Sequence, residues 1–137
     1  MDGATQQEMS RRQELVKNTR EMIKNALPIY DEDETSLMLD FNGFCLQIAF
    51  APLHPLMVFT MVQVVKASVS MKNISRINQM NLTSILGCHA LNSEAGYYSY
   101  RSTHWLETGI TPERFFEILE RCYEEAVSAF DQACNWQ

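Results

Sequence analysis

The residues in this sequence that could carry out chemistry are cysteine and histidine, and two of them are adjacent. Cys88 is followed directly by His89, and His104 lies further along the chain. A thiol beside an imidazole could act as a nucleophile with its base. Neighbouring residues of a strand point to opposite faces, however, so Cys88 and His89 cannot readily pair, and only His104 could approach Cys88 from an adjacent strand. We interpret Cys88 as a packed thiol and His89 as a partly exposed imidazole.

Metal binding and disulfide formation are both disfavoured by the spacing of the possible ligands. Cys88, His89 and His104 would need a fourth ligand from elsewhere. The acidic run Asp31–Glu34 has no glycine turn and no spaced ligand pattern, so it predicts a solvated loop and not a calcium site. The four cysteines contain no C-x-x-C pair, and we expect reduced, buried or half-buried thiols at Cys45, Cys88, Cys122 and Cys134. We predict no metal and no other cofactor.

Length and charge narrow the class of protein. The chain has 137 residues, 46% of them apolar, which is enough for one core, so we expect a single domain over residues 1–137 with a disordered segment at residues 1–8. The formal charge of −6 opposes the phosphate attraction on which nucleic-acid binding depends. Polar residues and prolines interrupt the longest apolar stretch, residues 44–65, and the N-terminus has no apolar secretory segment. These features predict a cytoplasmic protein that binds neither nucleic acid nor membrane.

The first half of the chain predicts a helix and then a hairpin. Apolar residues at three- and four-residue steps indicate a one-sided helix from about Gln6 to Ala26, which Pro28 ends. Asn42-Gly43 is a strong hairpin signal, because both residues tolerate the positive φ of a two-residue turn. That turn would pair Phe41 with Phe44, Leu39 with Leu46 and Leu37 with Ile48 on one core face.

A third strand is expected from Leu56 to Val65, and both of its faces are apolar. One face carries Leu56, Val58, Val62 and Val64. The other face carries Met57, Phe59, Met61 and Val65 and is more apolar than a solvent-facing surface should be. Either a helix of the protein or a partner must therefore cover this second face.

The second half predicts a helix, a hairpin and a final helix. Ser70 can cap a helix that ends near Asn81, and strands follow over residues 84–91 and 97–106. Thr111 caps the last helix with Pro112 at its first position, and its acidic residues, Glu125 among them, should form a solvated face. The whole order is α+β: a helix, a three-stranded antiparallel unit, a helix, a β-hairpin and a C-terminal helix, with five strands in the sheet.

Several short motifs in this order resemble one family. The segment Ile77-Asn78-Gln79-Met80-Asn81 resembles the apolar-Asn-x-x-Asn signature that ends the middle helix of YbjN-type bacterial proteins. Leu86-Gly87, the pair Tyr100-Arg101 and Thr111-Pro112-Glu113 also resemble the second half of that family. The YbjN family is similar in fold to the class I type III secretion chaperones, which are small acidic homodimers that bind extended segments of partner proteins. The resemblance implies structural roles for Asn78, Asn81, Gly87, Thr111 and Pro112, and it supplies no catalytic residue.

These observations predict a non-catalytic protein-binding module. We expect a homodimer that holds an unidentified partner polypeptide on its sheet through Met57, Phe59 and Met61, because flexible methionine suits a surface that accepts varied sequences. One alternative is a sensory or small-ligand-binding regulatory domain that uses the sheet as a pocket. A thiol enzyme at Cys88 is the least favoured alternative.

Overall fold

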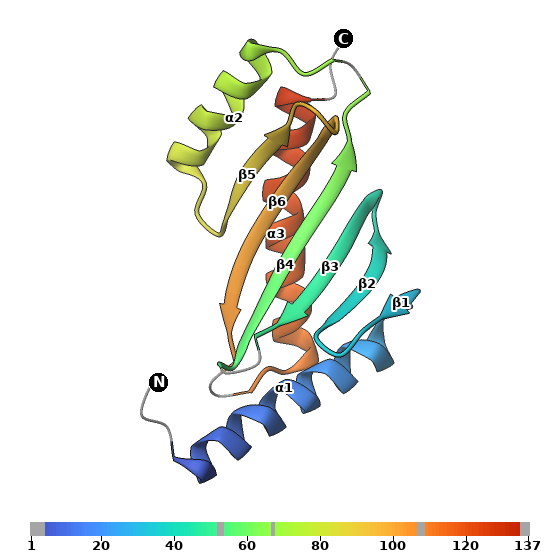
Figure 1. Cartoon of the computed structure of the whole chain (residues 1–137), viewed down its shortest axis with the longest axis vertical. Helices are drawn as coiled ribbons and strands as arrows, with labels where there is room; N and C mark the ends of the chain where they lie inside the picture. Colours follow the sequence, from blue (N-terminus) through green and yellow to red (C-terminus); the bar gives the residue numbers. More distant parts are fainter. Residues whose placement is uncertain (1–4, 52–53, 67, 107–108, 135–137) are drawn as a thin grey trace.

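The computed structural model describes residues 5–51, 54–66, 68–106 and 109–134. Within these residues one antiparallel sheet has six strands in the order β1-β2-β3-β4-β6-β5 (Figure 1). The strands are β1 (Asp31–Glu32), β2 (Ser36–Phe41), β3 (Phe44–Phe50), β4 (Leu56–Val64), β5 (Gly87–Asn92) and β6 (Tyr97–Trp105). The helices are α1 (Gln6–Ala26), α2 (Met71–Thr83) and α3 (Pro112–Ala133). The fold class is α+β, as the sequence predicts.

Helix α1 has the predicted bounds and lies across the lower end of the sheet (Figure 1). The hydroxyl of Thr5 accepts a hydrogen bond from the backbone N–H of Glu8 at 3.1 Å, which caps the first turn. The expectation of disorder over residues 1–8 is therefore wrong from Thr5 onward, and residues 1–4 lie outside the described residues.

The first hairpin turns at Asn42 and Gly43, as predicted. Their φ angles are 49° and 94°, the positive values that this turn requires. The register is also the predicted one, with Phe41 opposite Phe44, Leu39 opposite Leu46 and Leu37 opposite Ile48. These pairs place one face of the hairpin in the core.

Strand β1 is the sixth strand, which the sequence analysis missed. We expected the acidic run to be a loop, but Asp31 and Glu32 pair with Met38 and Leu37 at the edge of the sheet. The carboxylate of Glu32 accepts hydrogen bonds from Lys24 and Arg20 of α1, at 3.1 and 3.2 Å. These cations, Lys24 foremost, lower the pKa of Glu32 and offset the like-charge repulsion that had favoured a loop.

Helix α2 begins with a reciprocal cap and is tied to the end of α3. The hydroxyl of Ser70 accepts the N–H of Asn73, and the Asn73 side-chain oxygen accepts the N–H of Ser70. The amide nitrogen of Asn73 also donates to the carbonyl of Ala133 at 2.6 Å. The helix leads into β5, which pairs only with β6 and so forms the second edge of the sheet.

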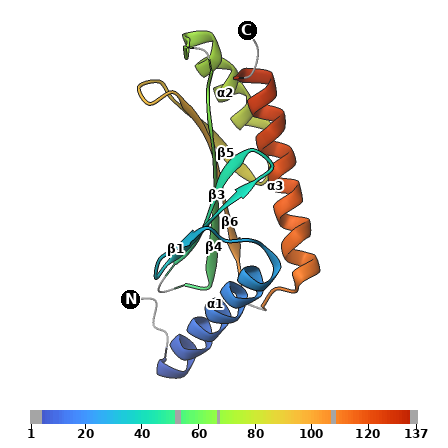
Figure 2. The same cartoon turned by 90° about the vertical axis from the view of Figure 1, so that its right-hand side faces the viewer.

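Helix α3 runs along one face of the sheet and covers the core (Figure 2). Its cap is the predicted one: the hydroxyl of Thr111 accepts the N–H of Arg114 at 3.1 Å, and Pro112 is the first helical residue. The buried positions of α3 include the predicted stripe Phe115, Leu119, Cys122, Ala126 and Phe130. Among the described residues, no helix lies in front of the opposite face of the sheet (Figure 2).

Candidate functional site

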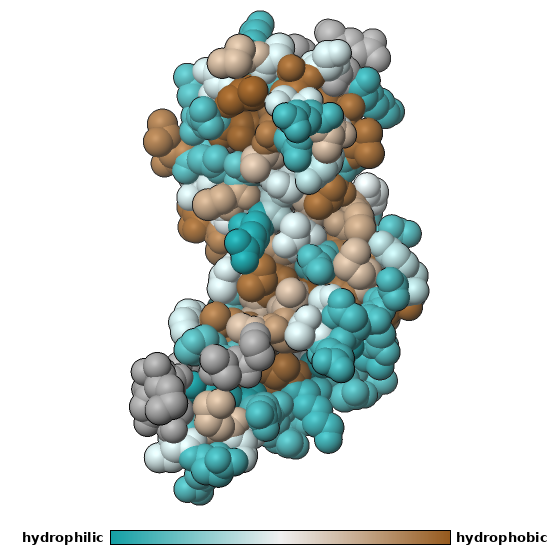
Figure 3. Space-filling view, viewed as in Figure 1, coloured by the Kyte–Doolittle hydropathy of each residue, from teal (hydrophilic) through white to brown (hydrophobic). Residues whose placement is uncertain are grey.

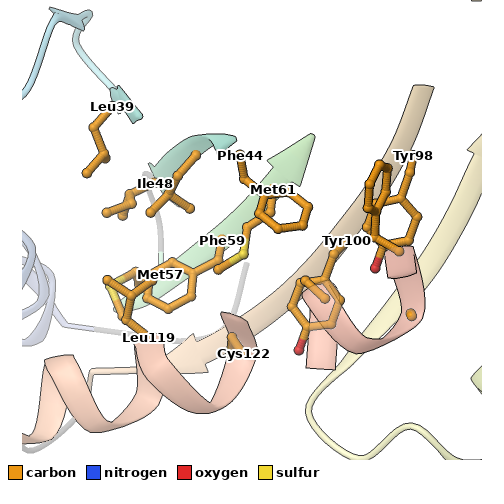
Figure 4. Packing of buried hydrophobic residues seen from close by; sticks show 14 of the residues in the cluster. Leu39, Phe44, Ile48, Met57, Phe59, Met61, Tyr98, Tyr100, Leu119 and Cys122 are labelled. Atoms are coloured by element: carbon orange, nitrogen blue, oxygen red, sulfur yellow. The ribbon is translucent and has the colours of Figure 1, made fainter. Parts of the chain in front are cut away.

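The predicted partner-binding residues Met57, Phe59 and Met61 lie in the core of the protein. All three are 0% exposed, and they reach from β4 toward α3 (Figure 4). This site assignment is wrong as it stands, because α3 packs over the face of β4 that carries them. The sequence predicted that either a helix of the protein or a partner covers this face, and the structure shows that a helix does.

The opposite face of the sheet is uncovered and carries the other apolar side chains of β4. We call this surface the open face. Its β4 members alternate with the core residues, and Val64 at the end of the strand is 70% exposed. On β6, Trp105 lies opposite Leu56 and is 63% exposed. The apolar side chains of the open face on these two strands are Leu56, Val58, Val62, Val64 and Trp105.

Figure 3 looks onto the open face and shows how the hydropathy of its residues changes along the molecule. Apolar side chains gather over the centre and the upper part, whereas hydrophilic side chains cover α1 at the lower end. The central strands thus present a weakly polar surface to solvent. Such a contiguous exposed apolar surface marks an interaction site more often than a random distribution of side chains.

Few charges interrupt the open face. Arg101 of β6 faces solvent there, opposite Thr60 of β4 and Cys88 of β5. Asp31 and Asp40 lie on the two strands at the other edge of the sheet. Among the described strand residues of this face, Arg101 is the one cation.

Gly87 is part of a joint between the start of β5, β6 and α3. The carboxylate of Glu125 accepts hydrogen bonds from the backbone N–H groups of Ile85, Leu86 and Gly87, at 2.8 to 3.2 Å. The hydroxyl of Tyr100 donates to the same carboxylate at 2.7 Å. A Cβ at Gly87 would lie 2.5 Å from the Tyr100 ring, so only glycine fits beside this pair. The expectation that Glu125 belongs to a solvated face is therefore wrong.

These hydrogen bonds determine the protonation state of Glu125. Partial burial alone would raise the pKa of the carboxyl, but the bonds from Tyr100 and from the three amides outweigh it and hold the pKa below its usual value. Burial, and then the hydrogen bond to Glu125, raises the pKa of Tyr100, so its hydroxyl stays protonated and donates. Glu125 is thus a carboxylate at neutral pH, hydrogen-bonded by four donors.

Asn81, another residue of the family signature, hydrogen-bonds with the backbone of β5. Its side-chain oxygen accepts the backbone N–H of His89 at 2.7 Å, and its side-chain nitrogen donates to the carbonyl of His89 at 2.9 Å. Asn81 therefore takes the place of a neighbouring strand beside β5. Asn78 is exposed on α2, and none of the hydrogen bonds described involves it. The resemblance thus groups one structural asparagine with one surface asparagine.

Two residues of β5, Gly87 and His89, point their backbone N–H and C=O groups away from β6, and these groups are already hydrogen-bonded. At Gly87 the N–H goes to Glu125, and the carbonyl accepts a hydrogen bond from the hydroxyl of Ser84 at 2.6 Å. At His89 both backbone groups go to Asn81. A further strand cannot pair with these positions while the side chains remain in place.

The structure separates the residues that suggested thiol chemistry. Cys88 is exposed on the open face, so its interpretation as a packed thiol is wrong. His89 is buried on the core face, where its Nδ1 lies 2.7 Å from the hydroxyl of Tyr98. His104 also lies on the core side, 3.6 Å from the sulfur of Cys122 and not near Cys88. The sequence argument against a Cys88–His89 pair is therefore correct, and its expected exposures are not.

A cluster of buried Cys122 and Ser102 with half-buried His104 was not predicted from the sequence. The hydroxyl of Ser102 lies 2.9 Å from Nε2 of His104 and 3.4 Å from the sulfur of Cys122. Burial raises the pKa of Cys122 and lowers the pKa of His104, so both groups are held neutral. A fully buried, protonated thiol is a packing residue and not a nucleophile.

The described residues were also compared with the requirements of a metal site and of a membrane-spanning helix. In the described part of the chain, no group of three or more His, Cys, Asp or Glu side chains could hold a metal ion. Over the same residues, every helix falls short of the length and apolarity that crossing a bilayer requires.

A cavity of about 350 Å³ lies between α1 and the end of β3. Its apolar lining includes Val16, Phe50 and Ala51. Its basic lining includes Arg12, Lys17 and Arg20, of which Arg20 also bonds the carbonyls of Asp33 and Glu34. The lining also contains the acidic residue Glu34, and Arg12 is paired with Glu8 at 3.4 Å, so the cavity combines apolar side chains with a mixed but mainly basic set of charges.

The outer surface of α2 and the loop after it carry a second exposed apolar cluster. Leu82 is 85% exposed and Ile85 is 89% exposed, and Met71 is exposed at the start of the helix. Leu82, at the end of the helix, and Ile85, just after it, thus place two large exposed aliphatic side chains three residues apart.

Comparison with known proteins shows likeness in structure only. No protein-family model matches the sequence, and no curated protein matches it either. YbjN from E. coli superposes with a TM-score of 0.65 at 15% identity, covering 85% of this chain and 89% of that chain. A chain of the ExsC–ExsE complex gives a TM-score of 0.67 at 12% identity, covering 94% and 98%. The Yersinia pestis type III secretion chaperone SycH, in complex with a fragment of YscM2, gives 0.58 at 10% identity, covering 86% and 98%.

These likenesses extend over most of both chains. At identities of 10 to 15% they establish architecture and no more. The chain therefore has the fold shared by YbjN and the type III secretion chaperones.

Proposed function

We propose that the protein is a non-catalytic, cytoplasmic binding module that works as a homodimer and holds a partner polypeptide on the open face of its sheet. The observation that carries this proposal is the uncovered apolar side of β4, where Val58 and Val62 lie at the centre and Val64 is largely exposed. Helix α3 already forms the second layer, on the other face of the sheet. In an antiparallel sheet with one face in solvent, that face usually carries polar side chains, so an apolar open face can be covered by a partner as a third layer.

The structures that share the fold support a protein partner. ExsC–ExsE, SycH with its YscM2 fragment and the HopA1–SchA chaperone–effector pair are all complexes of two proteins. The closed edge of β5 favours the face over strand addition as the contact, because Asn81 and Glu125 already occupy the outward backbone groups there.

Photo-crosslinking in the cells that make the protein tests this proposal. We would place a benzophenone side chain at Val64, on the open face, or at Ser128, on the exposed side of α3. Adducts to a separate polypeptide should form from position 64 and be lost when Val58→Asp and Val62→Asp are added. Ser93→Asp, a charge in the exposed turn after β5, is the matched control and should leave the adducts in place. Equal adducts from position 128, or adducts that survive the two valine changes, would refute the proposal.

The outer surface of α2 is our proposed contact between the two copies. Leu82 and Ile85 are exposed aliphatic residues three positions apart. A symmetric contact between two copies would bury both residues of each copy. Leu82→Glu with Ile85→Glu should convert the protein to a monomer in sedimentation experiments, whereas Asn78→Glu on the same helix should shift the equilibrium less. A wild-type protein that sediments as a monomer at high micromolar concentration would refute the dimer and leave the open-face proposal intact.

The cavity beside α1 favours one second candidate, a regulatory domain for a small amphipathic anion. Val16, Phe50 and Ala51 would contact an apolar body, and Lys17 with Arg12 would attract an acidic head group. Laurate, taken as a probe, should raise the melting temperature of the wild type and have less effect on Lys17→Glu. No shift with laurate or with a longer fatty acid would eliminate this candidate.

A further inference from the structure

Arg101 is an isolated cation in a neutral neighbourhood. Its side chain lies on the open face, with Thr60 directly opposite on β4 and Cys88 directly opposite on β5. Along its own strand the residues on the same face are Ser99 and Thr103. Arg101 forms no ion pair with any described residue. Its guanidinium therefore keeps all of its donors available to solvent or to a ligand.

The acidic residues of the open face are too far from Arg101 to form an ion pair with it. Asp40 lies on β2, which three strand spacings separate from β6, or about 14 Å at about 4.8 Å each. Asp31 lies on β1, one strand further out. At physiological ionic strength the Debye length is about 8 Å, so these carboxylates barely attract Arg101. They do make the β1–β2 edge unfavourable for a second acid.

Apolar side chains adjoin Arg101 on the side toward the centre of the sheet. Val58 and Val62 flank Thr60 on β4, so each is a diagonal neighbour of Arg101 on the same face. A polypeptide lying over β4 and β6 would meet two apolar positions, each about 7 to 8 Å from the one cation. The sheet thus offers both contact area and a single fixed charge.

We propose that the polypeptide held on the open face carries an aspartate or glutamate that pairs with Arg101, with apolar residues beside it that pack on Val58 and Val62. The proposal rests on the function proposed above and specifies the chemistry of the partner. A carboxylate matches the planar fork of arginine with two parallel hydrogen bonds. Because the protein as a whole is acidic, the pair selects the position of one acid and not a highly acidic partner.

A peptide selection on the whole protein tests the proposal without knowledge of the natural partner. A display library of random peptides of about 12 residues would be selected on the wild type, and each enriched peptide would be measured against Val58→Asp. Among peptides that Val58→Asp releases, we expect enrichment of Asp or Glu next to apolar residues. Their affinity should fall at least about tenfold on Arg101→Glu and recover in part when the acid of the peptide is changed to lysine.

Arg121→Glu is the matched control, since it makes the same change of charge on the exposed side of α3. It should leave peptide affinity unchanged. If peptides depend on Val58 but show no enrichment of acids and no response to Arg101→Glu, the inference is overturned and the open-face function stands. If no enriched peptide responds to Val58→Asp, the open-face function fails and the inference fails with it.

Discussion

Gly87 is the position at which a single methyl group should matter most. An added Cβ would lie 2.5 Å from the ring of Tyr100 and 2.6 Å from the carbonyl of Arg101. The backbone carbonyl cannot move away without disturbing the pairing of β5 with β6. We predict that Gly87→Ala lowers the free energy of unfolding by about 1 to 3 kcal/mol, the usual range for overpacking.

Urea denaturation measures this change, and the neighbouring residue provides the comparison. Cys88→Ala alters the next residue of the same strand, but on the exposed side, and should change stability by less than about 0.5 kcal/mol. Equal stabilities for Gly87→Ala and Cys88→Ala would mean that Tyr100 does not pack over Gly87 in solution.

Glu125 makes part of the stability dependent on pH. Its pKa in the folded protein lies below the usual 4.5, so the folded state resists protonation more than the unfolded chain does. Its contribution is fully present above the unfolded pKa and is lost as the pH falls through the folded pKa. We predict that Glu125→Gln is less stable than the wild type at neutral pH and that the difference narrows below about pH 4.5.

Thermal melting of both proteins across this range tests the prediction. The other titrating groups are common to wild type and variant, so their effects cancel in the difference. A difference between the two that stays constant down to acidic pH would show that the carboxylate charge is not what holds residues 85–87.

At the scale of elements, the side chain of Asn81 joins α2 to the edge of the sheet. Both backbone groups of His89 are bonded to Asn81, whereas Asn78 on the same helix is exposed. We predict that Asn81→Ala lowers the free energy of unfolding by about 1 to 2 kcal/mol and Asn78→Ala by less than about 0.5 kcal/mol. In hydrogen exchange, the amide of His89 should lose protection only in the Asn81 variant. Unchanged protection in that variant would contradict the bond.

The elements themselves were largely predictable because their signals are local. The bounds of α1, the turn at Asn42-Gly43 and the cap at Thr111 each depend on residues within one or two turns of chain. The direction in which β4 faces was not predictable, because Val58 and Val62 on one side are nearly as apolar as the methionines on the other. Only the packing of α3, which is distant in sequence, decides between the two sides.

The joint around Glu125 escaped sequence analysis for the same physical reason. Its partners Ile85 and Leu86 lie 40 and 39 residues away, and they contribute backbone groups that no side-chain pattern reveals. On α3 alone, Glu125 looks like any other acidic residue of a solvated face. The family resemblance pointed to Gly87 at this joint but gave no reason for it.

For the molecule as a whole, one buried and one half-buried imidazole, His89 and His104, set the response to mild acid. Burial lowers the pKa of His89, partly offset by Glu125, and it lowers the pKa of His104. As the pH falls past the unfolded value of 6.5, the unfolded chain takes up protons that the folded chain resists. We predict that the free energy of unfolding decreases between about pH 7 and about pH 5.5, before the carboxylates titrate.

Urea denaturation at several pH values measures this decrease. Replacing both residues, as His89→Gln with His104→Gln, should flatten the profile. A wild-type profile that is already flat over this interval would show that the two imidazoles are free to protonate in the folded state.

The side chains that occupy the edge of β5 have a consequence for the solution behaviour of concentrated protein. A bare strand at the end of a sheet is a template on which identical molecules add one after another into fibres. Here Asn81, Ser84 and Glu125 block one end of the sheet, and at the other end β1 has only two residues, both acidic. The protein can therefore expose an apolar sheet face for binding while the two edges of its sheet offer few free backbone groups to a further strand among the described residues.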